Sequence, residues 1–176
     1  RRIFGNLRRA MIFITAIHVP IAGMALIPIL MGLPQLLFPM HVVLLELVID
    51  PLCALVFEVE PSDRSAMQRP PRRPNEALFG PRQILIAMGQ GMGVLAGALG
   101  VYWWASIATG ETEARATAFV ALVMSVLVLA LTDSAASSRI FAPHRRIFWL
   151  IVLAVAVILA LVLFVPALNS VFRFST

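Results

Sequence analysis

Residues 36–57 read LLFPMHVVLLELVIDPLCALVF, and this stretch decides the class of fold. An α-helix needs about 20 mostly apolar residues to cross the hydrocarbon layer of a membrane, which is roughly 30 Å thick. The stretch has that length, and its only charged residues are Glu46 and Asp50, which lie in its interior. It therefore predicts a membrane-spanning helix that carries two carboxylates.

The rest of the chain has the same apolar character. Hydrophobic residues make up 60% of its 176 residues, charged residues make up 13%, and the mean hydropathy is +0.92. Soluble domains contain about 45–50% apolar and about 25% charged residues. We therefore expect an all-α polytopic membrane bundle of about five transmembrane helices, in a single domain over residues 1–176. The spans are expected at about 10–31, 36–57, 83–107, 116–131 and 147–165, with a cytoplasmic loop over 58–82.

The basic residues indicate how the helices are oriented. All fourteen are arginine, and twelve lie in the N-terminal flank, the loop 58–82 and the connection 137–146. These three segments lie on the same side of an alternating path, and positive charge marks the cytoplasmic side. The pattern predicts a cytoplasmic N-terminus and an external C-terminus. Because the arginines sit in short connections between apolar stretches, they indicate membrane orientation rather than a nucleic acid partner.

Glu46 and Asp50 are the first candidates for a functional site. Their spacing of four places both carboxylates on one side of a helix. Each charged group near the bilayer centre costs about 2.5–3.5 kcal/mol on insertion scales, so a compensating cation, proton or buried base is expected. Pro51 cannot donate a backbone hydrogen bond to Leu47, which leaves a carbonyl oxygen beside the carboxylates. These oxygens suit Ca²⁺, Mg²⁺, Na⁺, K⁺ or a proton. The alternative is a polar contact between helices with one carboxyl protonated.

His18 is the third candidate for a cation site, and it lies at a similar depth in the first span. Pro20 should free the carbonyl of Ala16 by the same argument that applies to Pro51. His18 would accept a proton or pair with one of the two carboxylates. The alternative is a packed histidine that only donates a hydrogen bond. His41 lies nearer the outer end of its span and is a weaker candidate.

Glycines recur at four-residue spacing in the third span, at Gly89, Gly93 and Gly97, with Gly91 and Gly100 nearby. A row of small residues lets a neighbouring helix approach closely in lipid. We expect this row to pack against another helix of the chain, and a dimer interface is the alternative.

The run FPMHVVLLELVIDP at 38–51 resembles the sixth transmembrane helix of P-type cation ATPases, in the calcium-pump-like branch. EPSD at 60–63, Met67 and RPPR at 69–72 are similar to the loop that follows that helix. RRIFGNLRR at 1–9 is similar to the stalk that enters the fifth helix. The later spans match in length and order, so the resemblance covers nearly the whole chain.

The resemblance implies the C-terminal transport segment of an ATP-driven pump. The two carboxylates of residues 36–57 fall where family members carry cation ligands in the sixth helix, and His18 and Ile21 fall where calcium pumps carry ligands in the fifth. Ile49 replaces a hydroxyl residue, and Val126 stands near an acidic ligand of the eighth helix. These departures favour a single-ion site, a proton-handling site or an altered specificity over a two-calcium site.

The resemblance also implies parts that the sequence does not contain. The phosphorylated aspartate motif, the nucleotide domain and the fourth and tenth helices are absent, and the chain begins at Arg1 without an initiator methionine. We therefore expect a piece of a longer pump, with no catalytic or cofactor-binding residue of its own. Its expected partners are the lipid bilayer, the remaining pump domains and an inorganic cation. ATP and Mg²⁺ would bind in the remaining domains, and the expected location is a bacterial inner membrane.

Two other classes of function remain open. The first is a stand-alone secondary transporter or proton-coupled channel that uses the same carboxylates without ATP, although no inverted repeat is visible. The second is a non-transport membrane subunit. A membrane-embedded enzyme is disfavoured because the sequence contains no HExxH, paired-cysteine or GxSxG motif.

Overall fold

The structure of the chain, a computed structural model, describes residues 2–57, 80–134 and 145–174, and side chains from Gly5 onward. These residues form helices and short connections, and no strand occurs among them. The described elements are α1 (Arg2–Leu30), α2 (Pro39–Pro51), the π-helical segment η1 (Leu52–Val56), α4 (Pro81–Ala108), α5 (Glu111–Ser134), α6 (Arg146–Phe164) and α7 (Pro166–Val171).

Five helices are long and apolar enough to cross a membrane, and the second of them is α2 continued by η1. The predicted all-α bundle of about five transmembrane helices is therefore confirmed. Most of the loop expected at 58–82 lies outside the described residues. Several helices begin earlier than the apolar stretches suggested, and α5 begins at Glu111 rather than near 116. Glu111 and Glu113 favour the first turn, because acidic side chains interact well with the positive end of the helix dipole.

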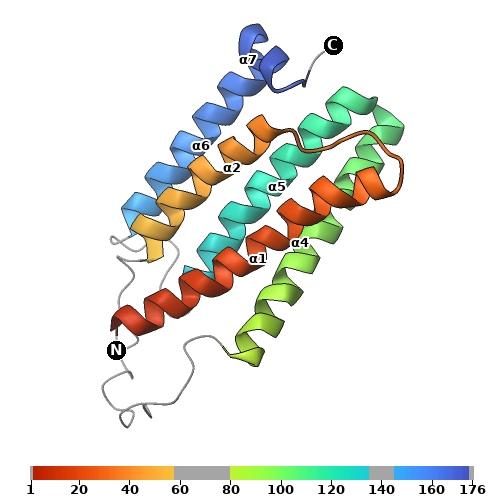
Figure 1. The fold of residues 1–176 in the computed structure, drawn as a ribbon. Helices are drawn as coiled ribbons and strands as arrows, with labels where there is room; N and C mark the ends of the chain where they lie inside the picture. Colours follow the sequence, from red (N-terminus) through yellow and green to blue (C-terminus); the bar gives the residue numbers. More distant parts are fainter. Residues whose placement is uncertain (1, 58–79, 135–144, 175–176) are drawn as a thin grey trace.

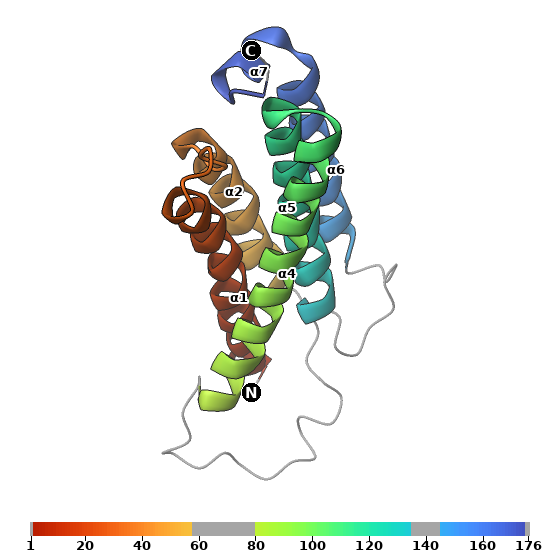
Figure 2. The ribbon, with the colours of Figure 1, turned by 90° about the vertical axis from the view of Figure 1, so that its right-hand side faces the viewer.

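α5 is the central helix of the bundle. It contacts α1, α2, α4 and α6, and its side chains Leu122, Val123 and Val126 are fully buried. α1 and α4 pack along each other and both contact α5 (Figure 1). α2 contacts both α5 and α6, and α5 and α6 also contact each other. The N-terminus and the C-terminus lie at opposite ends of the bundle in both views (Figure 2).

α1 and α4 approach each other closely at Gly91. A β-carbon at this position would overlap the carbonyl oxygen of Ala16 and would lie 2.6 Å from the β-carbon of Val19. Two steps along a helix turn a residue about 200° around its axis. Gly91 therefore points away from the row at 89, 93 and 97.

The expected packing of Gly89, Gly93 and Gly97 against another helix of this chain is wrong for the described residues. A β-carbon at any of these three positions would have no neighbour within 4 Å in this part of the chain. Four-residue spacing marks a face of small residues, but it does not tell whether the same chain covers that face. The alternative of an interface with another chain stays a prediction.

Candidate cation site

The two carboxylates lie on the side of α2 that the other described helices leave open. The buried side of α2 carries His41, Leu44, Leu45, Val48 and Ile49. Glu46 is half-buried and Asp50 is exposed. Within the described ranges, no hydrogen bond or ion pair joins either carboxylate to another residue. Both acceptor groups are therefore free to meet a ligand or another part of a larger protein.

The backbone beside the carboxylates departs from regular α-helix. Pro51 has no N–H to give to the carbonyl of Leu47, whereas the N–H of Leu52 donates to Val48, as in a regular α-helix, and also to Ile49. A π-helical segment follows, in which the N–H of Phe57 donates to the carbonyl five residues back, at Leu52. Single π-turns inside helices occur often at functional sites. The irregular segment thus begins after Asp50, and the role of the Leu47 carbonyl as a ligand stays a prediction.

His18 is exposed on α1, and its Nδ1 lies 2.7 Å from the carbonyl oxygen of Ile14. A carbonyl oxygen only accepts, so Nδ1 donates, and a neutral ring then has its lone pair on Nε2. That nitrogen could bind a cation or accept a proton. No hydrogen bond or ion pair joins His18 to Glu46 or Asp50 in the described part of the chain.

The three predicted site residues do not form a preassembled metal cluster. Among the described residues, no group of three or more His, Cys, Asp or Glu side chains is placed to hold a metal ion. The carbonyl oxygen of Ala16, expected as a further ligand, lies against Gly91 at the contact between α1 and α4. The assignment of these groups as cation ligands therefore stays a prediction.

Three other positions supply packing surface rather than ligands. The resemblance places Ile21 and Ile49 at ligand positions of calcium pumps and Val126 near one. All three are buried in the hydrophobic core. The interior of the bundle thus offers no side-chain oxygen at these positions.

Sequence reasoning missed a polar cluster at the end of the bundle where α2 begins. Arg115 is buried, and its guanidinium donates to the backbone oxygens of Gln35 (3.2 Å) and Arg173 (3.0 Å) and to the carboxylate of Glu111 (2.8 Å). His41, judged a weak candidate ligand, is fully buried beside it. A signal was present in the sequence, since Arg115 is one of only two arginines expected on the outer side.

Sequence reasoning also missed a polar pair between α4 and α5. The side-chain amide of Gln90 donates to Oδ1 of Asp133 at 2.7 Å. The second oxygen of each group, Oε1 of Gln90 and Oδ2 of Asp133, is buried and has no hydrogen-bond partner in the described structure.

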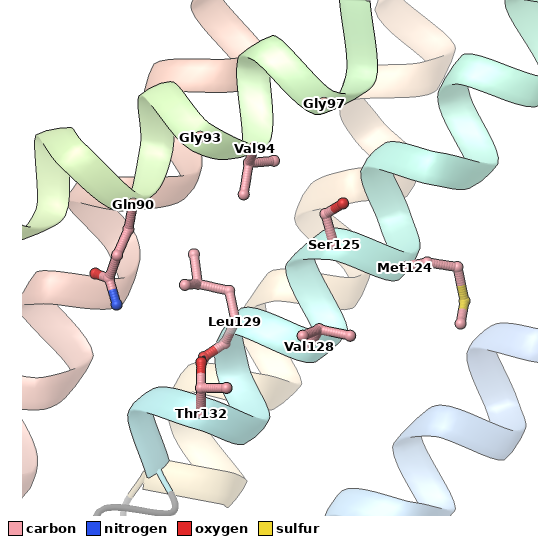
Figure 3. A pocket seen from close by; sticks show the side chains of 9 residues that line it. All are labelled: Gln90, Gly93, Val94, Gly97, Met124, Ser125, Val128, Leu129 and Thr132. Atoms are coloured by element: carbon pink, nitrogen blue, oxygen red, sulfur yellow. The ribbon is translucent and has the colours of Figure 1, made fainter. Parts of the chain in front are cut away.

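A groove between α4 and α5 begins at Gln90 and runs past two of the exposed glycines (Figure 3). The hydroxyls of Ser125 and Thr132 in its wall donate to carbonyls of their own helix, at Ala121 and Leu129. The groove is otherwise lined by apolar side chains and glycine, so it is not a cation site. Its lining residues are Gln90, Gly93, Val94, Gly97, Met124, Ser125, Val128, Leu129 and Thr132.

Five helices long and apolar enough to cross a membrane define an integral membrane protein, and one of these helices carries two carboxylates. Residues 34–176 match the family described as cation transporting ATPase, C-terminus. The chain therefore belongs to the cation-transporting ATPase family, as a segment of its C-terminal region, and the calcium-pump-like resemblance read from the sequence is confirmed.

Two curated relatives illustrate the match. The chain is 26% identical over 176 residues to the calcium-transporting ATPase type 2C member 2 of Mus musculus. The aligned region covers 97% of this chain and 19% of that protein. The chain is also 31% identical over 96 residues to the calcium-transporting ATPase 1 of Bacillus cereus. Here the aligned region covers 54% of this chain and 11% of that protein. The chain thus spans about a fifth or less of the length of these relatives.

Proposed function

We propose that this chain is the membrane transport segment of an ATP-driven P-type cation pump, and that Glu46 and Asp50 bind the transported cation. The observation that carries the proposal is the pair of carboxylates on the open side of α2. They lie within the part of the chain that matches the family, they have no partner among the described residues, and an irregular turn follows them. A buried or lipid-exposed carboxylate pair is costly without a counter-charge.

In this proposal, the site works by alternating access. Phosphorylation in the remaining domains of the pump shifts the helices, and the shift changes the affinity of the carboxylates for the cation and the side from which it is reached. The carbonyl of Leu47, which Pro51 leaves without its helical donor, adds a neutral oxygen ligand. Nε2 of His18 serves as a proton acceptor or a further ligand near the site.

The cation is expected to be hard, because carboxylate and carbonyl oxygens are the available ligands. The mouse and Bacillus cereus relatives are both named as calcium-transporting ATPases. However, Ile21, Ile49 and Val126 are core side chains here. We therefore propose a site for a single ion or proton rather than for two calcium ions.

We place the protein in a bacterial inner membrane, with its N-terminus in the cytoplasm. Twelve of the fourteen arginines lie in segments that this orientation puts on the cytoplasmic side. The two described ends of the chain lie at opposite ends of the bundle (Figure 1), which agrees with an odd number of crossings.

The test uses the full-length pump with Glu46→Gln, Asp50→Asn and the double variant. The measurement is the cation dependence of phosphoenzyme formed from ATP, with Ca²⁺, Mg²⁺, Na⁺, K⁺ and pH varied in turn. We expect each single variant to weaken the dependence at least about tenfold, the size expected for losing one charged ligand, and the double variant to abolish it.

Glu113→Gln is the matched control, because Glu113 is an exposed carboxylate in the first turn of α5, outside the proposed site. It should leave the cation dependence unchanged. If the double variant retains normal cation-dependent turnover, the proposed site is wrong. Cation flux that needs the carboxylates but not ATP would instead indicate a secondary transporter or channel.

A further inference from the structure

His41 connects the start of α2 to the C-terminal end of the described chain. The backbone N–H of Phe38 donates to its Nδ1 at 3.0 Å, and its Nε2 lies 2.9 Å from the carbonyl oxygen of Phe172. A backbone N–H only donates, so Nδ1 accepts and Nε2 carries the proton that it gives to Phe172. The imidazole is thus a neutral, fully buried ring with both nitrogens bonded.

Aromatic rings hold the imidazole from two further directions. The ring of Phe174 stacks on it, with centroids 4.8 Å apart and an interplanar angle of 13°. The ring of Phe119, on α5, lies at the same centroid distance on a tilted plane. The imidazole therefore joins α2, α5 and the segment 172–174.

Arginine side chains reinforce the same junction. The guanidinium carbons of Arg115 and Arg173 lie 5.1 Å and 4.9 Å from the centroid of the Phe38 ring, within the range of cation–π attraction. Arg115 also donates to the backbone oxygen of Arg173. We call this junction the outer clamp; it consists of Phe38, His41, Arg115, Phe119, Phe172, Arg173 and Phe174.

The outer clamp holds the end of the helix that carries the carboxylates. Glu46 follows His41 by five residues, which is about 7.5 Å along a helix axis. No proline interrupts α2 between His41 and Asp50, so a shift or rotation at His41 is transmitted to both carboxylates. α7 and the C-terminal end lie at the same end of the bundle as the start of α2 (Figure 1).

From this geometry we infer that His41 is a positioning residue: by bonding to Phe172 it fixes the height and rotation of α2 and so sets the affinity of the carboxylate site for its cation. The inference rests on the proposed function. His41 itself does not contact the cation, because both of its nitrogens are occupied and it lies on the buried side of α2.

The experiment compares His41→Leu, His41→Gln and Phe174→Ala in the full-length pump. The measurement is the cation concentration that gives half-maximal phosphoenzyme, together with the maximal level per folded protein. His41→Leu should raise the half-saturating concentration about fivefold, the size expected for loss of one hydrogen bond, with the maximal level little changed. His41→Gln keeps an amide N–H that can reach Phe172, so it should restore part of the affinity.

Phe174→Ala tests the outer clamp without altering α2, and it serves as the measurement if His41→Leu does not fold. It should shift the half-saturating concentration in the same direction. Ser106→Ala is the control, because the Ser106 hydroxyl is exposed near the same end of the bundle and donates only to its own helix, at Trp103.

The outcomes separate the two ideas. If Glu46 and Asp50 prove essential but the His41 and Phe174 variants keep wild-type affinity, the positioning role is wrong and the proposed function stands. The positioning role is also overturned if these variants lose only folded protein while the remainder binds normally. If cation dependence survives without the carboxylates, the proposed function itself fails.

Discussion

The polar side chains at the two ends of α2 differ in how many partners they have. Arg115 and His41 have several partners each, whereas Glu46 and Asp50 have none among the described residues. A polar group in an apolar setting loses free energy unless it is satisfied. The contrast therefore separates residues with partners inside the fold from the two residues that we propose as cation ligands.

The Gln90–Asp133 pair offers a prediction at this scale. Gln90→Leu removes the only hydrogen bond that the Asp133 side chain makes in the described structure. It should therefore lower the free energy of unfolding by about 1–3 kcal/mol. Removing both partners with Gln90→Leu/Asp133→Leu should recover most of that loss, because no buried polar group is then left unpaired. Thermal unfolding of the purified protein in detergent measures both. Additive losses in the double variant would contradict this account.

The sequence predicted some of these residues and not others for a physical reason. Glu46 and Asp50 stand out because a charge within an apolar run is costly wherever the helix packs. The bonds of Arg115 to Gln35 and Arg173, and of His41 to Phe172, instead join residues 58 to 131 positions apart in the chain. Helical periodicity reports only on neighbours within a few turns, so it cannot reveal such partners.

At the scale of whole helices, hydropathy predicted the number of spans, whereas packing between them depended on details of side-chain size. Five apolar stretches became five long helices, with ends extended by polar first turns that hydropathy does not register. The row at Gly89, Gly93 and Gly97 was expected to pack within the chain, but Gly91 on the opposite side makes the contact. Spacing identified the small residues without identifying the neighbour.

Substitution of these glycines tests the packing of α4. Gly91→Ala places a methyl group against the backbone of α1, so it should destabilise the protein by about 1–3 kcal/mol. Gly93→Ala meets open space in the described structure and should be neutral or stabilising by up to about 1 kcal/mol, since alanine favours helix. Unfolding midpoints in detergent provide the comparison. An equal loss for Gly93→Ala would show that another segment or chain covers that face.

For the molecule as a whole, the proposed orientation depends on the arginines in the segments before and between the membrane-spanning helices. The opposite ends of the two termini agree with an odd number of crossings, and the arginine pattern gives the direction. A direct measurement of sidedness tests it.

Single cysteines at the two ends of the bundle provide that measurement. In a Cys53→Ala background, Thr109→Cys at the end of α4 should react with a membrane-impermeant maleimide added to intact cells. Arg146→Cys at the start of α6 should react only after the membrane is opened. Both native residues are exposed, so access to the reagent should depend on sidedness. The reverse pattern would invert the orientation and place the N-terminus outside.

The outer clamp also bears on how the protein is made. His41 and Phe172 are separated by 131 positions, and nearly the whole described chain must leave the ribosome before their bond can form. The helix with the two carboxylates is therefore inserted long before its outer end is secured. A nascent chain that stops before Phe172 would contain all five long helices but could not form the bond between His41 and Phe172. We therefore expect α2 to take its final position only after the five helices have been inserted.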